Sequence, residues 1–320
     1  MENALEKIQS LGILPVINIP EEELAVPLAN ALTDGGIPAV EVTLRSDCSL
    51  SAISRIKNEF PEMSVGAGTV LSLEALKDAL SAGADYIVSP GFDREIVEYC
   101  VSNGIPTVPG CSTPTEIQAA VKAGLSTVKF FPSELNGGLS AIKLVSGAFP
   151  NVKFIPTGGM NFDNIGEYLS CGKIAACGGS YMATSAQLKN REFDKITEQC
   201  RKAMGISLGF RLAHIGINHK NGEEAEKTAQ LISGIFGLSV RKCSASCFAG
   251  EIAECMNSER FGEKGHIGIS TKSVFRAMKY LENKGIAFDE SSIKRDAAGN
   301  ITCIYLRKQI AGFALHIVKE

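Results

Sequence analysis

The sequence predicts an α/β protein: a (β/α)8 TIM barrel, followed by a second, smaller α+β domain of paired βαβββ units. Two observations predict the barrel. Short β-rich runs alternate strictly with amphipathic helical segments from Leu11 to about Met182, and this stretch holds eight such runs. A third observation predicts the second domain, because the tetrapeptide HIGI occurs twice, at residues 214–217 and 266–269. A chain of 320 residues also exceeds what one hydrophobic core usually serves.

Each predicted barrel strand is a short run rich in β-branched and other apolar residues. The runs are ILPVINI (13–19), AVEVTL (39–44), SVGAGTV (64–70), YIVSP (86–90), TVPGC (107–111), TVKFF (127–131), KFIPTGG (153–159) and IAACGGSYM (174–182).

The segments between these runs have apolar residues three and four apart and glycine near their ends, which indicates amphipathic helices. They include LAVPLANALTDGG (24–36), SLEALKDALSAGA (72–84), TPTEIQAAVKAGL (113–125) and FDNIGEYLSCGK (162–173). Strict alternation of strand and helix predicts a parallel sheet. Eight units in roughly 200 residues favour a closed barrel over an open doubly wound sheet.

The pattern changes after residues 191–210, which predict a last helix and a linker. Residues 212–240 and 265–290 each predict strand, helix and strand in that order, and HIGI lies near the start of both. We therefore expect the barrel over residues 1–205 and a separate domain over residues 211–320, with the boundary between 205 and 211.

Composition and charge restrict the partners and the compartment. The net charge is −3 with acids and bases mixed throughout, so no electrostatic footprint for nucleic acid or an anionic membrane is expected. Acids precede the first apolar run, and Pro15 and Pro20 interrupt it, which argues against a signal peptide or a spanning helix. The ten cysteines are irregularly spaced without a CxxC pair, as expected for buried reduced thiols. We expect a cytoplasmic protein.

Lys129 is the least expected residue of the barrel strands, because it lies within the apolar run TVKFF. Burial disfavours the charged form of a lysine, so its amine can attack a carbonyl carbon and form an imine. Next to a carboxylate, an imine is an electron sink that lets a carbon–carbon bond break. All four histidines lie in the last third of the chain, so a base for the barrel must come from elsewhere.

The carboxyl ends of barrel strands face a common mouth, so polar residues there are candidates for a site. Besides Lys129, these candidates are Glu41, Arg45, Thr69, Pro90, Gly91, Thr157, Gly158, Gly159, Gly178, Gly179 and Ser180. Glu41 is the candidate base, and the fork of Arg45 suits a carboxylate. The backbone amides of TGG and GGS suit a phosphate.

Structural roles remain open for each residue. Lys129 can be an edge lysine that reaches solvent, and Glu41 and Arg45 can form an ion pair. PTGG can be only a turn, and Thr69 can simply pack.

The motifs PVI, GGIPAVEVTLR, VGAGTVL, SPG, VKFFP, PTGG and GGSYM occur in this order over the whole barrel. In this respect residues 11 to about 204 resemble the 2-keto-3-deoxy-6-phosphogluconate (KDPG) and 2-keto-4-hydroxyglutarate (KHG) aldolase family. The resemblance implies a class I Schiff-base aldolase that needs no cofactor and assembles as a homotrimer. Such an enzyme would cleave a keto acid to pyruvate plus glyceraldehyde 3-phosphate or glyoxylate.

The resemblance also implies roles for individual residues. Lys129 would form the imine with pyruvate and Glu41 would move protons. Arg45 and Thr69 would hold the pyruvate carboxylate. The distal phosphate would be held by Gly158, Gly159, Gly179 and Ser180.

The repeated unit is similar to the vicinal-oxygen-chelate superfamily, which includes glyoxalases, dioxygenases and metal-free binding proteins. The resemblance implies a divalent metal held by His214 and His266 from opening strands and by Glu254 and His316 from closing strands. Glu251 is an alternative to Glu254, and the histidines can instead cap or pack. His219 is expected in a surface loop.

Two other functions remain open. The barrel can be a phosphate-binding isomerase or epimerase that uses the same glycines without an imine. It can also be a scaffold for a sensor or binding domain at the carboxyl end.

Overall fold

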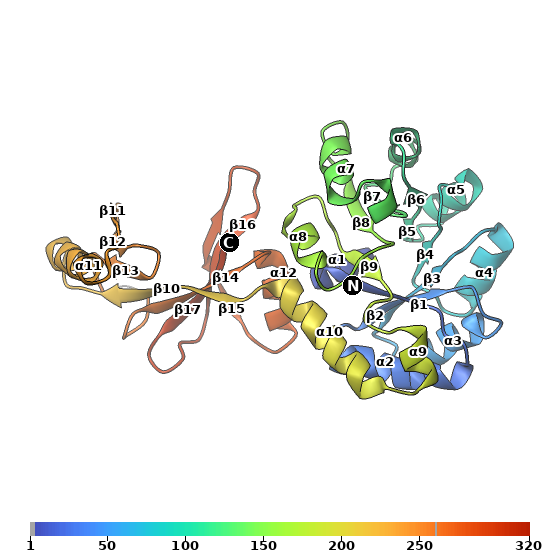
Figure 1. Ribbon diagram of the computed structural model, residues 1–320, viewed down its shortest axis with the longest axis horizontal. Coiled ribbons are helices and arrows are strands. Elements are labelled where there is room, and N and C mark those ends of the chain that lie inside the picture. Colours follow the sequence, from blue (N-terminus) through green and yellow to red (C-terminus); the bar gives the residue numbers. More distant parts are fainter. Residues whose placement is uncertain (1–3, 260) are drawn as a thin grey trace. The chain divides into compact units, whose positions relative to one another are not determined.

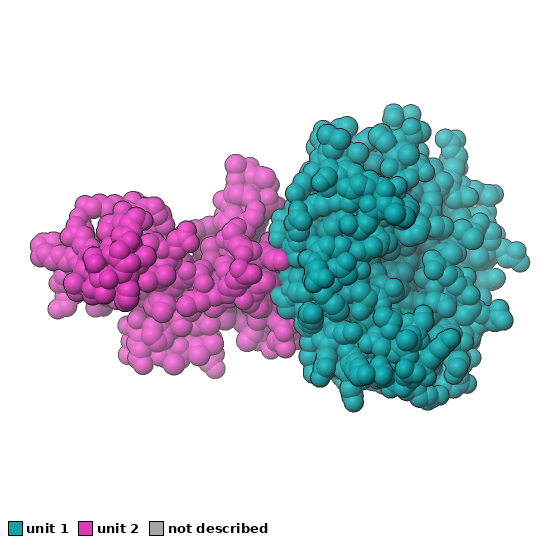
Figure 2. Space-filling view, viewed as in Figure 1, with its two compact units in different colours: residues 1–207 teal, residues 208–320 magenta. Residues whose placement is uncertain are grey.

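The computed structural model describes residues 4–259 and 261–320. The chain divides into two compact units, Met1–Ser207 and Leu208–Glu320 (Figure 2). Among the described residues, no helix has both the length and the apolar character needed to cross a membrane.

Two parallel sheets form the centre of the first unit. Their strands run in the orders β5-β4-β3-β2-β1-β9 and β6-β7-β8. The strands are β1 (Ile13–Ile17), β2 (Ala39–Thr43), β3 (Ser64–Gly68), β4 (Tyr86–Val88), β5 (Thr107–Val108), β6 (Gly110–Cys111), β7 (Thr127–Phe130), β8 (Lys153–Pro156) and β9 (Cys177–Gly179). Both sheets are curved, and the strand pairs within them are parallel.

Backbone contacts join the two sheets at both of their edges. At one edge, Thr157 and Gly178 form a parallel bridge between the ends of β8 and β9. At the other edge, β5 and β6 follow each other in the chain and pair with β4 and β7 respectively. The Gly110 amide also donates to the Ser89 carbonyl oxygen at 3.0 Å.

Helices surround these strands, as Figure 1 shows for α2 to α8. They are α1 (Ala4–Leu11), α2 (Ala25–Asp34), α3 (Ser49–Glu59), α4 (Leu73–Ser81), α5 (Arg94–Ser102), α6 (Pro114–Lys122), α7 (Gly138–Val145), α8 (Ile165–Ser170), α9 (Ser185–Lys189) and α10 (Phe193–Leu208), with 3-10 turns η1 (Glu22–Leu24) and η2 (Glu134–Asn136). Capping side chains fix the residue at which several of these helices begin. At α6, Thr113 and Glu116 form a reciprocal capping box, and Pro114 occupies the first turn.

The strands are buried because helices cover their outer side and side chains fill their inner side. Val40, Val65, Val128 and Phe154 are fully buried. Such apolar strands are typical of parallel sheets. A polar side chain on these strands is therefore held among apolar neighbours in one orientation.

The second unit is a mixed sheet with two helices among its described residues. Its strand order is β11-β12-β13-β10-β14-β17-β16-β15. Its elements are β10 (Arg211–Asn218), α11 (Gly222–Phe236), β11 (Val240–Lys242), β12 (Ser246–Ala249), β13 (Ala253–Met256), β14 (His266–Thr271), α12 (Val274–Glu282), β15 (Phe288–Arg295), β16 (Ile301–Leu306) and β17 (Ala314–Lys319). Each half runs strand, helix and three strands.

The two halves meet at the antiparallel pair of β10 and β14. Within each half, the first strand pairs in parallel with the last, β10 with β13 and β14 with β17. The halves are therefore arranged symmetrically about the centre of the sheet.

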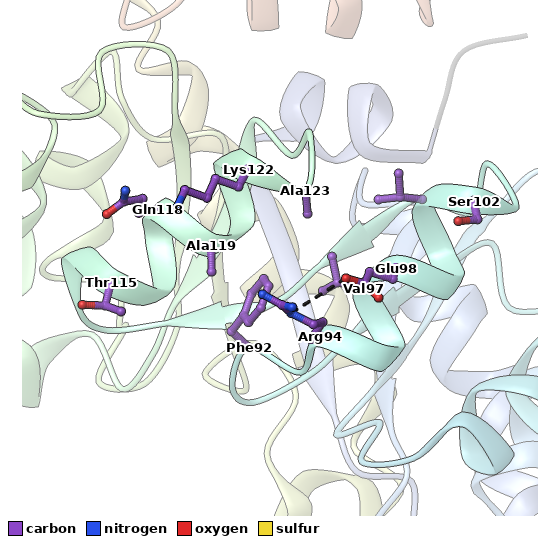
Figure 3. A pocket seen from close by; sticks show the side chains of 11 residues that line it. Phe92, Arg94, Val97, Glu98, Ser102, Thr115, Gln118, Ala119, Lys122 and Ala123 are labelled. Carbon is purple, nitrogen blue, oxygen red and sulfur yellow. Dashed lines mark ion pairs between the residues drawn. The ribbon is translucent and has the colours of Figure 1, made fainter.

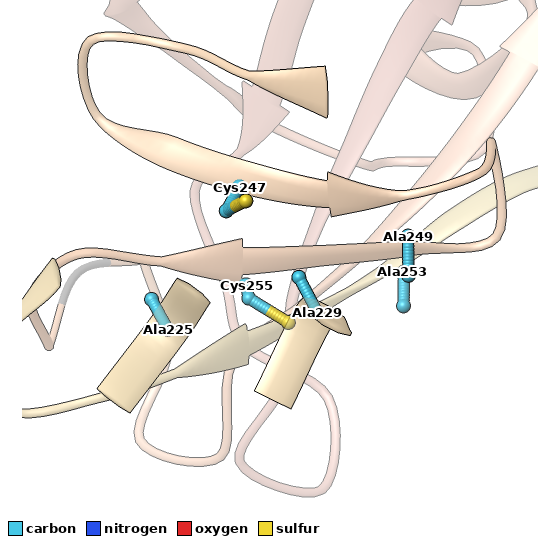
Figure 4. Packing of buried hydrophobic residues seen from close by; sticks show 6 residues of the cluster. All are labelled: Ala225, Ala229, Cys247, Ala249, Ala253 and Cys255. Carbon is cyan, nitrogen blue, oxygen red and sulfur yellow. The ribbon is translucent and has the colours of Figure 1, made fainter. Parts of the chain in front are cut away.

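A small core of alanine and cysteine side chains packs between α11 and strands β12 and β13 in the first half (Figure 4). It consists of Ala225, Ala229, Cys247, Ala249, Ala253 and Cys255. Cys247 and Cys255 alternate along their strands with Ser246 and Glu254, so those two polar residues lie on the opposite face of the sheet.

Candidate active site

Lys129 lies on β7 with only 6% of its surface exposed. Its Nζ donates a hydrogen bond of 3.0 Å to Glu41 Oε1 and lies 5.5 Å from the centre of the Phe131 ring. The lysine therefore points inward and does not reach solvent from a strand edge. A buried amine with one carboxylate partner and an aromatic neighbour is suited to nucleophilic attack on a carbonyl carbon.

Glu41 lies on β2 and is 1% exposed. Among the described residues its ion-pair partner is Lys129, and no ion pair joins it to Arg45. Gly68 at the end of β3 makes room for it, because a Cβ at Gly68 would lie 2.3 Å from Glu41 Oε1. This role of Gly68 was not predicted from the sequence, although the small residues of GAGT were a signal for a close approach to β3.

Arg45 and Thr69 lie close together, because Arg45 follows the end of β2 and Thr69 follows the end of β3. Arg45 Nε donates to Thr69 Oγ1 at 3.2 Å, and Arg45 is exposed. Thr69 has a φ of 59°, the left-handed region that a threonine rarely adopts. A threonine held in this strained conformation beside a guanidinium is a candidate anion contact.

The glycines after β8 adopt conformations that favour glycine, with φ of 91° at Gly158 and 88° at Gly159. Thr157 bridges to Gly178, the neighbour of Gly179 and Ser180. The predicted phosphate residues therefore come from two adjoining strand ends. Pro90 follows β4, and its carbonyl group lies against Gly110, where a Cβ would be 2.0 Å from the oxygen.

A groove of about 410 Å³ lies elsewhere, between α5 and α6 (Figure 3). Its lining includes Phe92, Val97 and Ala119, and the ion pair of Arg94 with Glu98 at 3.8 Å borders it. Neither Lys129 nor Glu41 lines this groove. The candidate active site is identified by its chemistry and not by the size of a cavity.

Comparison with known proteins agrees with this geometry. The model of the family described as KDPG and KHG aldolase matches residues 4–199. The chain belongs to the KDPG and KHG aldolase family. Its first unit is an aldolase-type α/β fold, and the protein is an aldehyde-lyase, a class I aldolase that works through a Schiff base with pyruvate and needs no metal for it.

Individual relatives support the assignment. A 2-dehydro-3-deoxy-phosphogluconate aldolase of Treponema pallidum is 38% identical over 206 residues, which are 64% of this chain and 98% of the relative. The KHG/KDPG aldolase of Escherichia coli K12 is 39% identical over 204 residues, 63% of this chain and 96% of the relative.

A solved structure extends this comparison. A KDPG aldolase from Legionella pneumophila, with pyruvate captured as a covalent carbinolamine, is 38% identical with a TM-score of 0.61, covering 63% of this chain and 98% of that one. The family match ends at residue 199 and does not extend to the second unit of this aldolase.

The second unit holds a separate cluster of four side chains, which we call the histidine cluster: His214, Glu254, His266 and His316. His214 Nε2 lies 3.2 Å from both His266 Nε2 and His316 Nε2. Glu254 Oε2 lies 3.3 Å from His214 Nε2 and 3.1 Å from His266 Nε2. Ligand atoms of the three histidines lie within 4.8 Å of one another, an arrangement that can hold a metal ion.

The glycines of the two HIGI motifs create the space for this cluster. A Cβ at Gly216 would lie 2.0 Å from Cε1 of His266, and a Cβ at Gly268 would lie 2.5 Å from Nε2 of His316. The repeat pointed to His214 and His266, whereas the role of its glycines appears only when β10, β14 and β17 lie side by side.

The surroundings of the cluster favour a neutral imidazole at His316 and an ionised carboxylate at Glu254. Burial, followed by the neighbouring His214 and His266, lowers the pKa of His316 to about 3. Burial alone would raise the pKa of Glu254, but hydrogen bonds from His214, His266 and Ser246 outweigh it and hold that pKa well below its usual range. Metal ligands must be in these protonation states.

Other candidates have different surroundings. His219 lies outside the cluster, and its ring nitrogens contact the Ile217 carbonyl oxygen and Thr228 Oγ1 at 3.0 and 2.9 Å. Glu251 is exposed, and the cluster contains Glu254 in its place.

Proposed function

We propose that this aldolase cleaves a 2-keto-3-deoxy-6-phospho sugar acid, KHG, or both, to pyruvate and an aldehyde. The aldehyde is glyceraldehyde 3-phosphate or glyoxylate. The observation that carries the proposal is the buried pair of Lys129 and Glu41, with Nζ and Oε1 3.0 Å apart. A nucleophile and a proton acceptor within hydrogen-bond reach are what imine-based cleavage needs.

The reaction follows from this pair. Lys129 Nζ adds to carbonyl carbon C2, and loss of water gives the imine. Glu41 accepts the proton of the C4 hydroxyl group, the C3–C4 bond breaks, and the aldehyde leaves an enamine on Lys129. Glu41 returns the proton to C3, and water then hydrolyses the imine, which releases pyruvate and restores the amine.

The neighbouring residues orient the keto acid. Arg45 and Thr69 bind the pyruvate carboxylate, and the contact of Arg45 Nε with Thr69 Oγ1 supports this pairing. Pro90 and Thr157 contact the substrate at the strand ends. The backbone of Gly158, Gly159 and Gly179, together with Ser180, binds the distal phosphate.

Reductive trapping tests the imine. Borohydride added with pyruvate should attach the three-carbon unit to Lys129, which mass spectrometry of peptides locates. Lys57 is the internal control, because it too is held by a carboxylate, with Nζ 2.9 Å from Asp85 Oδ2, and should remain unlabelled. Absence of label on Lys129 would favour the isomerase or epimerase alternative.

The choice of keto acid is tested by turnover. A panel of phosphorylated and unphosphorylated 2-keto acids should give pyruvate from at least one hydroxylated member. A chain that cleaves none of them, although correctly folded, would support the alternative in which the barrel is a scaffold for a sensor or binding domain.

We also propose that the two curled sheets form one closed (β/α)8 barrel, since backbone contacts join both pairs of edges. We propose a homotrimer as well. Leu135 and Leu144 are 87% and 81% exposed and lie close in sequence on η2 and α7, as expected for residues that a second subunit covers. Light scattering on the full chain would contradict this by giving the mass of a monomer.

For the second unit we propose a vicinal-oxygen-chelate (glyoxalase-like) domain that binds one divalent metal through the histidine cluster. Three imidazoles and one carboxylate suit such an ion. The imidazole ligand atoms lie within 4.8 Å of one another, and Glu254 Oε2 lies 3.3 Å from His214 Nε2 and 3.1 Å from His266 Nε2. A bound metal would supply Lewis acidity to a chelating ligand. The three histidines and Glu254 would hold it by Nε2 and carboxylate oxygen atoms.

Metal content tests this proposal. The purified chain should contain about one equivalent of a divalent metal, and changing both His214 and His266 to alanine should abolish it. Added zinc, nickel, manganese or iron should raise the melting temperature of the second unit, because a ligand of the folded state stabilises it. A chain without metal and without thermal response would identify the histidines as structural residues.

A further inference from the structure

The two halves of the second unit place their closing ligands in equivalent surroundings. In the first half, Glu254 on β13 lies opposite Phe248 on β12. In the second half, His316 on β17 lies opposite Tyr305 on β16. An aromatic residue therefore stands across the strand pair from each closing ligand.

A small polar residue also precedes each of these aromatic residues by two positions. In the first half it is Ser246, which lies opposite Met256, and in the second half it is Cys303, which lies opposite Val318. Residues two apart in a strand share a face, so Ser246 and Cys303 lie on the face of the histidine cluster.

Each of the two contacts its own closing ligand. Ser246 Oγ donates to Glu254 Oε1 at 2.7 Å, and Cys303 Sγ lies 3.2 Å from His316 Nδ1. Ser246 is 3% exposed and Cys303 is 6% exposed, so water does not compete readily for these contacts. Both contacts use the ligand atom that faces away from the other ligands.

The contact at His316 selects between two forms of the imidazole. His316 Nε2 faces His214 at 3.2 Å, so it is the nitrogen available to a metal. A neutral imidazole that binds metal by Nε2 carries its proton on Nδ1. That proton then points to the sulfur of Cys303, which accepts it, although sulfur is a weak acceptor.

His266 provides the contrast within the same cluster. Its Nδ1 is buried and has no hydrogen-bond partner among the described residues. The ring of His266 instead packs against Gly216, which has no side chain and so leaves room for the ring. Away from the other ligands, the two closing ligands are therefore oriented by hydrogen bonds, whereas the Nδ1 side of His266 is oriented by packing alone.

We propose that Ser246 and Cys303 are matched positioning residues of the metal site, which fix the orientation of Glu254 and the Nδ1-protonated form of His316. The inference rests on the proposed metal site. Neither residue touches the ion, and each acts through the ligand that it contacts. The serine donates to a carboxylate oxygen, and the thiol accepts from an imidazole N–H.

The test measures the affinity of the full chain for zinc and cobalt by competition with a coloured chelator. The His214→Ala/His266→Ala variant is the control that shows how much metal binds to thiols outside the site. Ser246→Ala and Cys303→Ala should each weaken binding about tenfold or more, as loss of an outer partner typically does. Cobalt bound to Cys303→Ala should show a changed visible spectrum.

Two variants separate positioning from packing. Cys303→Ser keeps an acceptor and should restore affinity and spectrum toward those of the natural chain. Cys247→Ala removes a thiol that is 3% exposed but lies in the core under α11, so it should leave both unchanged. The melting temperature of each metal-free variant shows whether the unit is folded.

The outcomes distinguish the two proposals. Absence of metal binding by the natural chain rejects the metal site and the positioning roles together. If the natural chain binds metal, and Ser246→Ala and Cys303→Ala bind it equally well with the same spectrum, the metal site stands and the positioning roles are rejected. Failure of Cys303→Ser to recover would also reject the acceptor role of Cys303.

Discussion

The Lys129–Glu41 pair and the histidine cluster are both built on strands, but they depend on different levels of structure. Lys129 is on β7 of one sheet and Glu41 is on β2 of the other, so their contact requires the two sheets to curl around a common interior. The four residues of the histidine cluster lie on β13, β10, β14 and β17, which are consecutive in a single sheet. The first site depends on the curling of the two sheets toward each other, and the second depends on strand register.

This difference predicts which structural changes would disrupt each site. A slip of one residue between neighbouring strands would move a ligand of the histidine cluster to the opposite face. In the first unit, helices and inner side chains hold the strands from both sides, so the Lys129–Glu41 pair depends on the whole unit. The two sites nevertheless share one structural feature: a glycine on the adjacent strand leaves space for a functional side chain.

The largest expected effect is that of Lys129→Ala, which removes the nucleophile. Cleavage should fall by roughly 10⁴-fold or more, because no imine forms. Steady-state pyruvate release measures it, and metal binding by the histidine cluster is the control, which should be unchanged. Turnover close to that of the natural chain would exclude the imine mechanism.

Glu41→Gln should have the next largest effect, a loss of about a hundredfold or more in kcat. The amide cannot accept the proton from the C4 hydroxyl group, while Lys129 remains available. Borohydride trapping with pyruvate should therefore persist. If trapping disappears in a folded protein, Glu41 is also needed to form the imine.

Gly68→Ala tests the space beside Glu41. The added Cβ would lie within 2.3 Å of Glu41 Oε1, so the carboxylate must move away from its place beside Lys129. We expect kcat to fall about tenfold, the order of a modest displacement of a catalytic group. Gly172→Ala is the matched control, since no atom lies within 4 Å of its new Cβ. Equal activity of the two variants would contradict the role of Gly68.

Gly268→Ala makes the corresponding change in the histidine cluster. Its Cβ would lie 2.5 Å from Nε2 of His316 and 2.7 Å from Cε1 of His214, so both rings must shift. Metal affinity should fall about tenfold while aldol cleavage remains normal. Chelator competition and a pyruvate assay on the same sample measure the two. Loss of both activities would show that the units are coupled.

Ser180→Asp should have the smallest effect. Its carboxylate repels a distal phosphate, so KM for a phosphorylated keto acid should rise several-fold more than KM for an unphosphorylated one. The ratio of the two KM values is the measurement, and Ser180→Asn is the uncharged control. Equal changes for both substrates would move the phosphate to another part of the site.

The sequence predicted a closed (β/α)8 barrel, and the parallel α/β part of that prediction is confirmed because alternating strand and helix signals are local. Lys129 was also detectable, since a charged residue interrupts an apolar run. The ion-pair partner of Glu41 was not predictable, because the sequence equally allowed a pair with Arg45. Only the approach of β2 to β7 in the fold makes Lys129 the partner. HIGI signalled His214 and His266, whereas the contact of Cys303 with His316 depends on the register of β16 and β17. Cross-strand contacts of this kind have no signal along the chain.

The symmetric order of the second unit also has a consequence for fragments of the chain. Each half provides one histidine from its first strand and one ligand from its last, so a separated half holds two of the four ligands. If the proposed metal site is correct and the chain is cut within the connection between β13 and β14, a divalent ion would bridge the two pieces and favour their association by mass action. Reassembly of co-expressed halves would then depend on metal concentration, and the unit would work as a metal-controlled split protein.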